Sequence, residues 1–234
     1  MAGAINYVAT VSSTANASSY TFTDASIGTA ASDRIVCVVV AYRSAGNVTV
    51  SSVTIGGNAA TAAAECQNFS TNTGFCGIYY LAVASGTTAN IVVSLSGTAA
   101  RCCVDVYEAT GINSTPHATG TDISSPYSIS LDIPAEGVAL GGFQAAATAT
   151  VNWTNLTERA DTQVESAMQA ASASDNFATQ QTGLAISVSS GSNDLPAFAV
   201  VSWGPATGGA GVVGPLTFGR LTGGGILAGG RLIR

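Results

Sequence analysis

The stretch RIVCVVVAYR, residues 34–43, decides the fold of this chain. Eight successive residues, from Ile35 to Tyr42, are apolar, and most of them are β-branched. Such residues favour strands, and the run is far shorter than the roughly 20 residues of a membrane span. Because both alternating faces of the strand are apolar, we expect a central strand that is covered on each side.

Two other segments, residues 89–96 and 127–133, alternate with period two. Their apolar faces are formed by Ala89, Ile91, Val93 and Leu95, and by Tyr127, Ile129, Leu131 and Ile133. Period two with one polar face is typical of antiparallel strands that cover a core on one side. The segments around residues 34–43 are therefore expected to form antiparallel sheets.

Short runs of β-branched and aromatic residues, separated by Gly, Asn, Ser and Asp, continue along most of the chain. We expect strands at residues 19–23, 34–43, 48–55, 59–65, 76–83, 89–96, 101–108, 127–133, 137–146, 151–157, 164–171, 183–189 and 197–203. About a dozen strands with turn signals every 8–12 residues are typical of a sandwich or a jelly roll. In residues 161–173 a strand or irregular structure is favoured, and a helix is the alternative, because Ala, Met, Gln and Glu are helix formers.

The prediction is therefore an all-β protein with two parts. Residues 1–203 form one antiparallel, jelly-roll-like β-sandwich domain, and residues 204–234 form a Gly-rich extended C-terminal tail. A chain of this size can bury about 70% of its unfolded surface, so it needs neither a metal nor a disulfide merely to fold.

Composition excludes several classes of function. Charged residues make up 9% of the chain, against about 25% in an ordinary soluble domain. The net charge of −6 argues against nucleic-acid binding, which needs basic groups that face phosphates. There is no polybasic patch for an anionic membrane, and we expect no membrane insertion. The first residues, MAGAINYVATVSS, lack a basic region, so we expect no secretory signal there.

The composition shifts at Gly204, after which 11 of 27 residues up to Gly230 are glycine. A Gly-rich segment gains little from burial and loses much entropy when ordered. We nevertheless expect a partner to bind this tail through Leu216, Phe218, Arg220, Leu221, Ile226, Leu227, Arg231 and Arg234. Strand addition and pairing of arginine with carboxylates would supply the contacts. The alternatives are an edge strand on the chain's own sandwich and a disordered tail.

The residues offer little for catalysis or metal binding. His117, the single histidine, lies in the loop sequence NSTPHATG and is typical of a solvated surface residue. Without lysine, a Schiff base and a P-loop are excluded, and the sequence has no Gly-x-Ser-x-Gly elbow. Asp24, Asp33, Asp122 and Asp132 lie near predicted turns, where Asp normally accepts hydrogen bonds from backbone amides.

We therefore expect no enzyme, no catalytic residue, no metal site and no cofactor. Two alternatives stay open. Loop carboxylates could bind calcium, and two carboxylates from distant strands could form a glycosidase pair.

The five cysteines are the most specific feature of the sequence, and their odd number leaves at least one thiol without a partner in the chain. Cys66 and Cys76 bracket the segment QNFSTNTGF between two predicted strands, so a hairpin would let them face each other. A disulfide there would close a loop of about eleven residues and stabilise the fold by about 3 kcal/mol in the chain-entropy model. The alternative is two reduced, small core residues.

Cys102 and Cys103 are adjacent in a predicted strand and must point to opposite faces. The pattern places Cys102 with Val104 on the apolar face and Cys103 with Asp105 on the polar face. We therefore expect Cys102 to be buried and Cys103 to lie near the surface, where it is a candidate for a disulfide to another chain. The alternative is a free or buried thiol.

The large aromatic residues are candidates either for the core or for stacking on sugar rings. Trp203 ends a predicted strand and is expected in the core. Trp153 and Tyr107 are the candidates for stacking on a ligand, with Tyr42 and Tyr79 as further exposed aromatics in that interpretation. For Trp153, a core position is the alternative.

Four stretches carry a resemblance to a known family: IGTAASDRIVCVVVAYR, VSSVTIGGNAAT, GIYYLAVASGTTANIVVSLSG and RCCVDVYEATG. Together they resemble a recurring β-sandwich module of virion proteins in tailed bacteriophages and prophages. The likeness runs from Phe22 to Gly111, about half of the chain, with a weaker echo in AVVSWGP at residues 199–205. The resemblance implies a particle component of the head-decoration, collar, neck or tail-fibre type, and it carries over no catalytic residues.

We therefore expect a non-enzymatic structural subunit of a virion, attached to other virion proteins through residues 204–234. It would be assembled in the host cytoplasm and lie in the mature extracellular particle. The low-charge surface and apolar tail favour a homo-oligomer, and a trimer is common in such proteins by analogy. The alternative function is a carbohydrate- or host-receptor-binding module, with host surface glycans as its ligands.

Overall fold

The structure is a computed structural model, and it describes residues 1–69, 71–147 and 150–206. In these ranges the chain forms seventeen β-strands and one short 3-10 turn, Glu165–Ala167. The predicted all-β class is confirmed. The predicted tail lies almost entirely outside the described residues.

The strands divide between two halves of the chain. The N-terminal half contains β1 (Ala4–Ser13), β2 (Ala17–Ser26), β3 (Ile35–Ser44), β4 (Val50–Ile55), β5 (Asn58–Ala59), β6 (Thr61–Phe69), β7 (Thr73–Ala82), β8 (Thr88–Ala99) and β9 (Arg101–Thr110). The C-terminal half contains β10 (Ala118–Asp122), β11 (Tyr127–Ile133), β12 (Gly137–Ala145), β13 (Val151–Thr154), β14 (Thr157–Gln163), β15 (Gln169–Phe177), β16 (Gln181–Ser190) and β17 (Ala197–Trp203).

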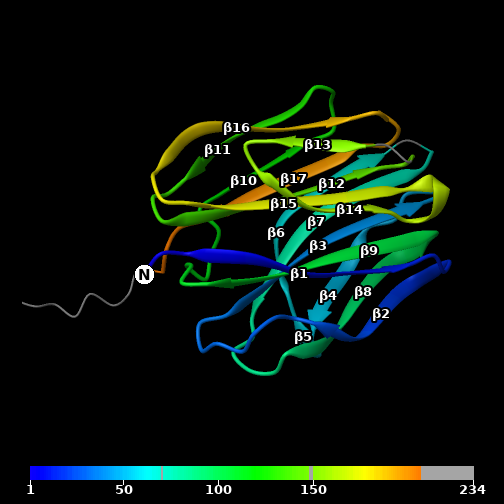
Figure 1. The fold of residues 1–234 in the computed structure, drawn as a ribbon. Coiled ribbons are helices and arrows are strands. Elements are labelled where there is room, and N and C mark those ends of the chain that lie inside the picture. The colour runs from blue at the N-terminus through cyan, green and yellow to red at the C-terminus, as the bar shows by residue number, and fades with distance from the viewer. Residues whose placement is uncertain (70, 148–149, 207–234) are drawn as a thin grey trace, which may run out of the picture.

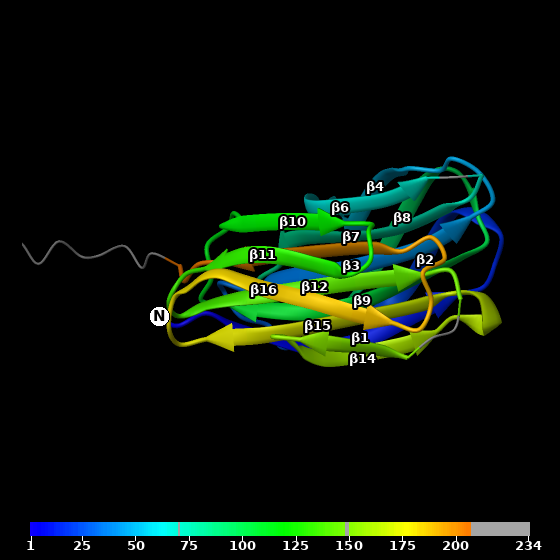
Figure 2. The same cartoon turned by 90° about the horizontal axis from the view of Figure 1, so that it is seen from above.

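These strands form four antiparallel sheets stacked as layers (Figures 1 and 2). The N-terminal outer sheet has the order β2-β8-β4-β5, and the N-terminal inner sheet has the order β1-β9-β3-β7-β6. The C-terminal inner sheet has the order β10-β17-β12-β15-β14, and the C-terminal outer sheet has the order β11-β16-β13. Figure 1 shows the two outer sheets at opposite ends of the stack.

The two halves have the same topology. In each half the first strand pairs with the last, the second with the second-last, and the third with the third-last: β1 with β9, β2 with β8 and β3 with β7, then β10 with β17, β11 with β16 and β12 with β15. This nesting of antiparallel pairs across two sheets is the jelly-roll arrangement. The chain is thus a tandem pair of jelly rolls, and β5 is a two-residue addition in the first of them.

Three hydrophobic cores separate the four layers. The first lies between the two N-terminal sheets and contains Val38, Tyr42 and Phe75. The third lies between the two C-terminal sheets and contains Leu131 and Phe143. The second core lies between the two inner sheets, where β3, β7 and β9 face β12 and β17. The sequence predicted one sandwich over residues 1–203, whereas the structure has two sandwiches joined by a shared core.

The stretch that decides the fold is β3, at the centre of the N-terminal inner sheet. Its even-numbered residues, such as Val38 and Val40, belong to the first core. Its odd-numbered residues, Cys37 and Val39, belong to the second core. Every residue from Ile35 to Ala41 is at least 95% buried, which confirms a central strand covered on both sides.

Glycine lets the two inner sheets approach each other. A Cβ atom on Gly142 of β12 would lie 2.4 Å from Val39 Cγ1 and 2.7 Å from Cys76 Sγ, both on the opposite inner sheet. On the other face of β12, a Cβ atom on Gly141 would lie 2.6 Å from Trp153 Cζ3. The pair Gly141-Gly142 thus brings β12 into close contact with a neighbour on each of its two sides.

Several boundaries differ from the sequence-based expectation. Strands β1 and β10 and nearly all of β14 were not predicted. The segment 161–173 consists of strand and irregular structure, as favoured over a helix, but not of one strand: β14 ends at Gln163 and β15 begins at Gln169, with the 3-10 turn between them. Glu165 has a φ of +54°, which interrupts both a strand and a helix.

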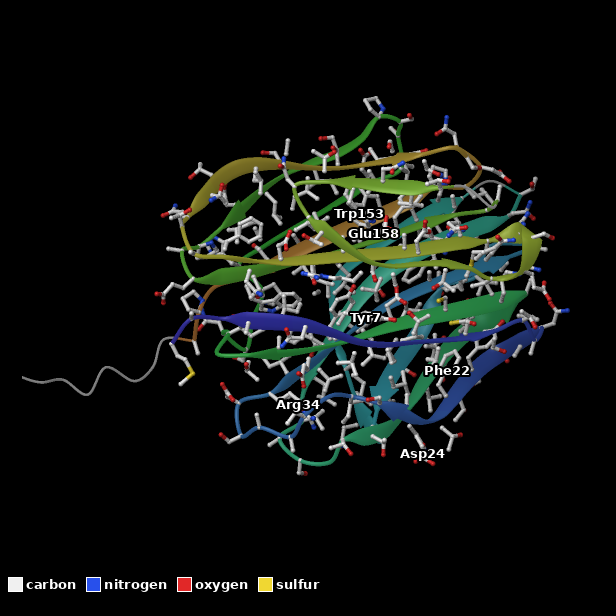
Figure 3. All side chains as sticks on the ribbon, viewed as in Figure 1. Tyr7, Phe22, Asp24, Arg34, Trp153 and Glu158 are labelled. Atoms are coloured by element: carbon white, nitrogen blue, oxygen red, sulfur yellow. The ribbon has the colours of Figure 1, made fainter. Side chains whose placement is uncertain are left out.

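Arg34 is buried at one end of the first jelly roll, where it binds the backbone of two loops. It is 1% exposed, and its guanidinium group donates hydrogen bonds to five backbone carbonyls: those of Ile27, Gly28, Val83, Ser85 and Gly86, at 2.7–3.3 Å. Figure 3 shows Arg34 among the loops at the lower end of the N-terminal half. The planar fork of arginine therefore fixes the loop before β3 and the loop before β8 together.

Arg34→Lys should lower the free energy of unfolding by about 3 kcal/mol, because an ammonium group cannot reach five carbonyls and leaves several of them without a donor. Denaturant unfolding of the variant and the wild type measures the difference. Arg159→Lys is the control, since Arg159 is exposed, and it should change stability by less than about 1 kcal/mol. A loss of unfolding free energy below about 1 kcal/mol for Arg34→Lys as well would show that the five hydrogen bonds of Arg34 contribute little to stability.

Candidate functional site

Every cysteine of the chain is reduced and buried, Cys37, Cys66, Cys76, Cys102 and Cys103 alike. Cys66 and Cys76 do face each other in register across β6 and β7, as the predicted hairpin requires. The predicted disulfide between them is nevertheless wrong, because both thiols are free core residues. Burial raises the pKa of the Cys66 thiol, which accordingly stays protonated and donates a hydrogen bond to the Asp122 carbonyl at 3.4 Å.

The prediction of a surface position for Cys103 is also wrong, because its exposure is 1%. Strand β9 lies between β1 and β3, and its face with Cys103, Asp105 and Tyr107 packs against the C-terminal inner sheet. Cys103 belongs there to a small buried cluster with Met168 and Ala170. The polar residues on that face thus mark a buried contact between the two halves, and Cys103 has no access to another chain.

A polar network crosses this contact. The carboxylate of Asp105 accepts a hydrogen bond from Thr10 Oγ1 of β1 at 2.5 Å and another from Ser172 of β15. Ser172 Oγ in turn accepts a hydrogen bond from the Tyr107 hydroxyl at 2.7 Å. The network therefore joins three strands of both inner sheets, and Asp105, 2% exposed, is its only acid.

Burial raises the pKa of Asp105 to about 6, although the hydrogen bonds from Thr10 and Ser172 lower it. The ionisable groups nearby are the thiols of Cys103 and Cys76, whose pKa values Asp105 raises further, and the Tyr107 hydroxyl. Burial raises the pKa of the Tyr107 hydroxyl, and Arg159 of β14, from the C-terminal half, partly opposes this rise. No described cation forms an ion pair with Asp105, since the two ion pairs among the described residues are Arg101–Glu165 and Arg159–Asp175.

The expected aromatic ligand site does not form. Tyr107 is fully buried, and its ring meets Tyr7 edge to face at 5.6 Å between centroids, so it cannot stack on a sugar. Tyr42 and Tyr79 are buried in the first core. Tyr107 shares its strand face with polar residues, and such a face usually meets solvent. Here that face packs against the C-terminal inner sheet, so the sequence pattern wrongly indicated an exposed ring.

The two tryptophans belong to the C-terminal half. Trp203 is fully buried in the second core, as expected. Trp153 of β13 is partly buried and packs against the third core, edge to face with Phe198 at 5.7 Å (Figure 3). Its ring packs against Gly141, so that this face of the indole is not available to a ligand.

The loop aspartates serve the backbone, as expected for three of the four. Asp33 accepts from the Gly111 amide at 2.8 Å, Asp122 from the Ser124 amide at 2.8 Å, and Asp132 from the Gly183 amide at 2.7 Å. At Asp24 it is the backbone amide that forms a hydrogen bond, which it donates to Asn90 Oδ1 at 3.0 Å.

The edge between the halves carries a pocket of about 350 Å³ lined by Glu65, Cys66, Gln67, Thr121, Asp122 and Ile123. Its two carboxylates already accept hydrogen bonds, Glu65 from the Tyr79 hydroxyl and Asp122 from backbone amides. His117 is exposed in its loop and is not among the residues that line this pocket. Over the described ranges, no three His, Cys, Asp or Glu residues group in a way that could hold a metal ion. Likewise, none of the helical structure in the described part of the chain is long and apolar enough to cross a membrane.

Charge is divided sharply along the chain. All thirteen acidic residues and four of the seven arginines lie at or before Asp194, which gives that part a formal charge of −9. Residues 207–234 hold the other three arginines, Arg220, Arg231 and Arg234, and no acid, a formal charge of +3. The predicted tail contacts, from Leu216 to Arg234, lie outside the described residues.

Comparisons of the chain with protein-family models, with curated proteins and with solved structures find no match. The class of this protein is therefore defined by its architecture, two jelly rolls of identical topology stacked through their inner sheets.

The stability of the wild type relative to Asp105→Asn should depend on pH. A folded-state pKa of about 6 lies above the value near 3.8 of an exposed carboxyl, so the native state binds the proton more tightly than the unfolded state. Asp105 therefore does not destabilise the fold below about pH 4, and destabilises it by about 3 kcal/mol above about pH 6. Asn keeps the acceptor for Thr10 and carries no charge.

Denaturant unfolding of both proteins between pH 4 and pH 7.5 gives the difference directly, and Asp105→Asn should gain on the wild type as pH rises. Asp194→Asn is the control, because Asp194 is exposed, and its difference from the wild type should stay flat. A flat profile for Asp105→Asn as well would show that the carboxylate is solvated.

The five thiols should react with a polar thiol reagent only after unfolding, because each is at most 3% exposed and burial keeps its pKa above the ordinary value. The measurement is the release of chromophore from Ellman's reagent in native buffer and in denaturant, beside a non-reducing gel. Five thiols in denaturant, almost none in native buffer and no covalent multimer are the expected results. Rapid native labelling, or a disulfide-linked band, would contradict the burial of Cys103.

Proposed function

We propose that this protein is a non-enzymatic structural subunit of a bacteriophage particle, of the head-decoration, collar, neck or fibre type. In this proposal the body of two jelly rolls is displayed on the particle, and residues 204–234 attach it to neighbouring virion proteins. The subunit would be a homo-oligomer, with a trimer as one form, and would lie in the mature virion.

The observation that carries the proposal is the division of the chain. The body holds a charge of −9 and uses three cores to fix four layers, whereas residues 207–234 combine a charge of +3 with apolar residues spaced by glycine. A segment of this composition suits binding to a groove or sheet edge of a partner, with main-chain hydrogen bonds and side-chain pockets.

Two further points support it. Jelly rolls are frequent in viral capsid proteins, although a fold alone does not fix a function. The likeness of residues 22–111 to a virion module now has a counterpart in the second half, because the echo at residues 199–205 falls on β17, which occupies the same place in its jelly roll as β9 does in the first. The alternative, a module for host glycans, loses the stacking residue Tyr107, which is buried.

Truncation after Ala206 should leave a folded protein that no longer joins particles. The test uses lysates that carry the gene with and without residues 207–234, and measures the chain that sediments with purified particles. We expect occupancy to fall at least about tenfold, the effect of losing 1.4 kcal/mol or more of binding free energy. A variant with Arg220, Arg231 and Arg234 all changed to Lys keeps the charge and is the matched control. Full occupancy of the truncated chain, or absence of the intact chain from particles, would contradict the proposal.

A further inference from the structure

A second pocket opens where the two jelly rolls meet at one end of the stack. It has a volume of about 260 Å³ and is lined by Ala2, Gly3, Glu136, Asn176, Phe177 and Ala178. Its walls come from the first residues of the chain, from the turn before β12 and from the end of β15, tied together by hydrogen bonds from the Gly3 amide to the Glu136 carbonyl and from the Ile5 amide to Asn176. The half-buried ring of Phe177 and the exposed Ala178 give it an apolar wall, and Glu136 supplies a carboxylate at the rim.

The last described residues of the chain run beside this pocket. The Ala206 amide donates to the Gly111 carbonyl at 2.7 Å, and Pro205 bridges to Ile112. Gly111 in turn touches Ala2 of the pocket so closely that a Cβ atom on it would lie 2.6 Å from the Ala2 carbonyl oxygen. Ala206, after which 28 residues remain in the sequence, is therefore bonded to Gly111, and Gly111 contacts Ala2 in the pocket wall.

Length and chemistry match the segment to the pocket. Leu216 lies ten residues beyond Ala206, and ten residues can span up to about 33 Å, so the tether is long enough to reach the pocket without strain. Leu216 and Phe218 offer apolar side chains of the size that such a pocket accepts, and Arg220 follows at once. Its charge is opposite to that of Glu136 and of Asp33, which holds the Gly111 amide at 2.8 Å.

We propose that residues 212–221 of the same chain occupy this pocket, with Leu216 and Phe218 against Phe177 and Ala178, and with Arg220 beside Glu136. A short tether favours the chain's own segment, because it supplies an effective concentration of the order of millimolar, above the protein concentration of most solutions. The inference rests on the proposed function, since it treats this segment as an attachment device that stays covered until a neighbouring virion protein competes for it.

The test places a single reactive thiol in the pocket of the full chain. Ala178→Cys creates it, and Ala185→Cys, exposed on β16, is the reference outside the pocket; the native thiols are buried. With the pocket occupied, Ala178→Cys should react with Ellman's reagent about tenfold more slowly than the same variant that also carries Leu216→Ser and Phe218→Ser. The rate of Ala185→Cys should be the same in both backgrounds.

The charge contact has its own comparison. In the Ala178→Cys background, Glu136→Gln should raise the labelling rate, while Asp194→Asn, a neutralised carboxylate elsewhere on the surface, should leave it unchanged. The protection should be independent of protein concentration over a hundredfold dilution.

Equal labelling rates of Ala178→Cys with and without the two serine substitutions would overturn the inference, and protection that disappears on dilution would assign the pocket to a second copy. This outcome is separate from that of particle binding. If Ala178→Cys is labelled fast and particle occupancy depends on residues 207–234, the inference is wrong and the proposed function stands. If Ala178→Cys is labelled slowly and occupancy does not depend on residues 207–234, the pocket is occupied but the proposed function is wrong.

Discussion

The face-to-face contact of the two inner sheets is the constraint on which the rest of the structure depends. Each inner sheet is covered on both sides, and its strands must present apolar or small residues in both directions. The sheets approach closely because β12 contributes Gly142, opposite Val39 and Cys76, and because β17 contributes the small residues Ala197 and Ala199 to the same core. Larger side chains at these positions would push the layers apart and open the second core to water.

This constraint also explains which polar groups are buried. Asp105, Ser172 and Tyr107 satisfy one another across the contact, so that polar residues on two facing sheets form hydrogen bonds in place of water. The same contact holds four of the five cysteines, Cys37, Cys66, Cys76 and Cys103, as small, protonated core residues. A body built in this way presents its outer sheets to its surroundings, which suits a displayed subunit in the proposed function.

Much of this fold could be predicted from the sequence. A run apolar on both faces identified β3 as a central strand, and period-two alternation identified β8 and β11 with the correct inward faces. The sequence also indicated that a hairpin would let Cys66 and Cys76 face each other, and the two residues pair in register across β6 and β7. Local pattern reports these features because each depends on only one strand and its immediate neighbour.

The stacking of two sandwiches could not be predicted in this way. A strand with a polar and an apolar face, such as β9, gives the same sequence pattern whether its polar face meets water or a second polar sheet. Cys103 and Tyr107 were assigned to the surface for that reason, and both are buried. The repeat of topology was also hidden, since it depends on which strands pair and not on the pattern within any one strand.

The central claim is that the inner-sheet contact makes the two jelly rolls one cooperative unit. Native-state hydrogen exchange in increasing denaturant tests it most directly, with the amides of Val38 in β3 and Leu140 in β12 as probes of the two halves. If the two halves unfold together, both amides exchange with the same free energy and the same dependence on denaturant. If one half lost its protection at a lower free energy while the other stayed folded, the jelly rolls would be independent and the claim would be wrong.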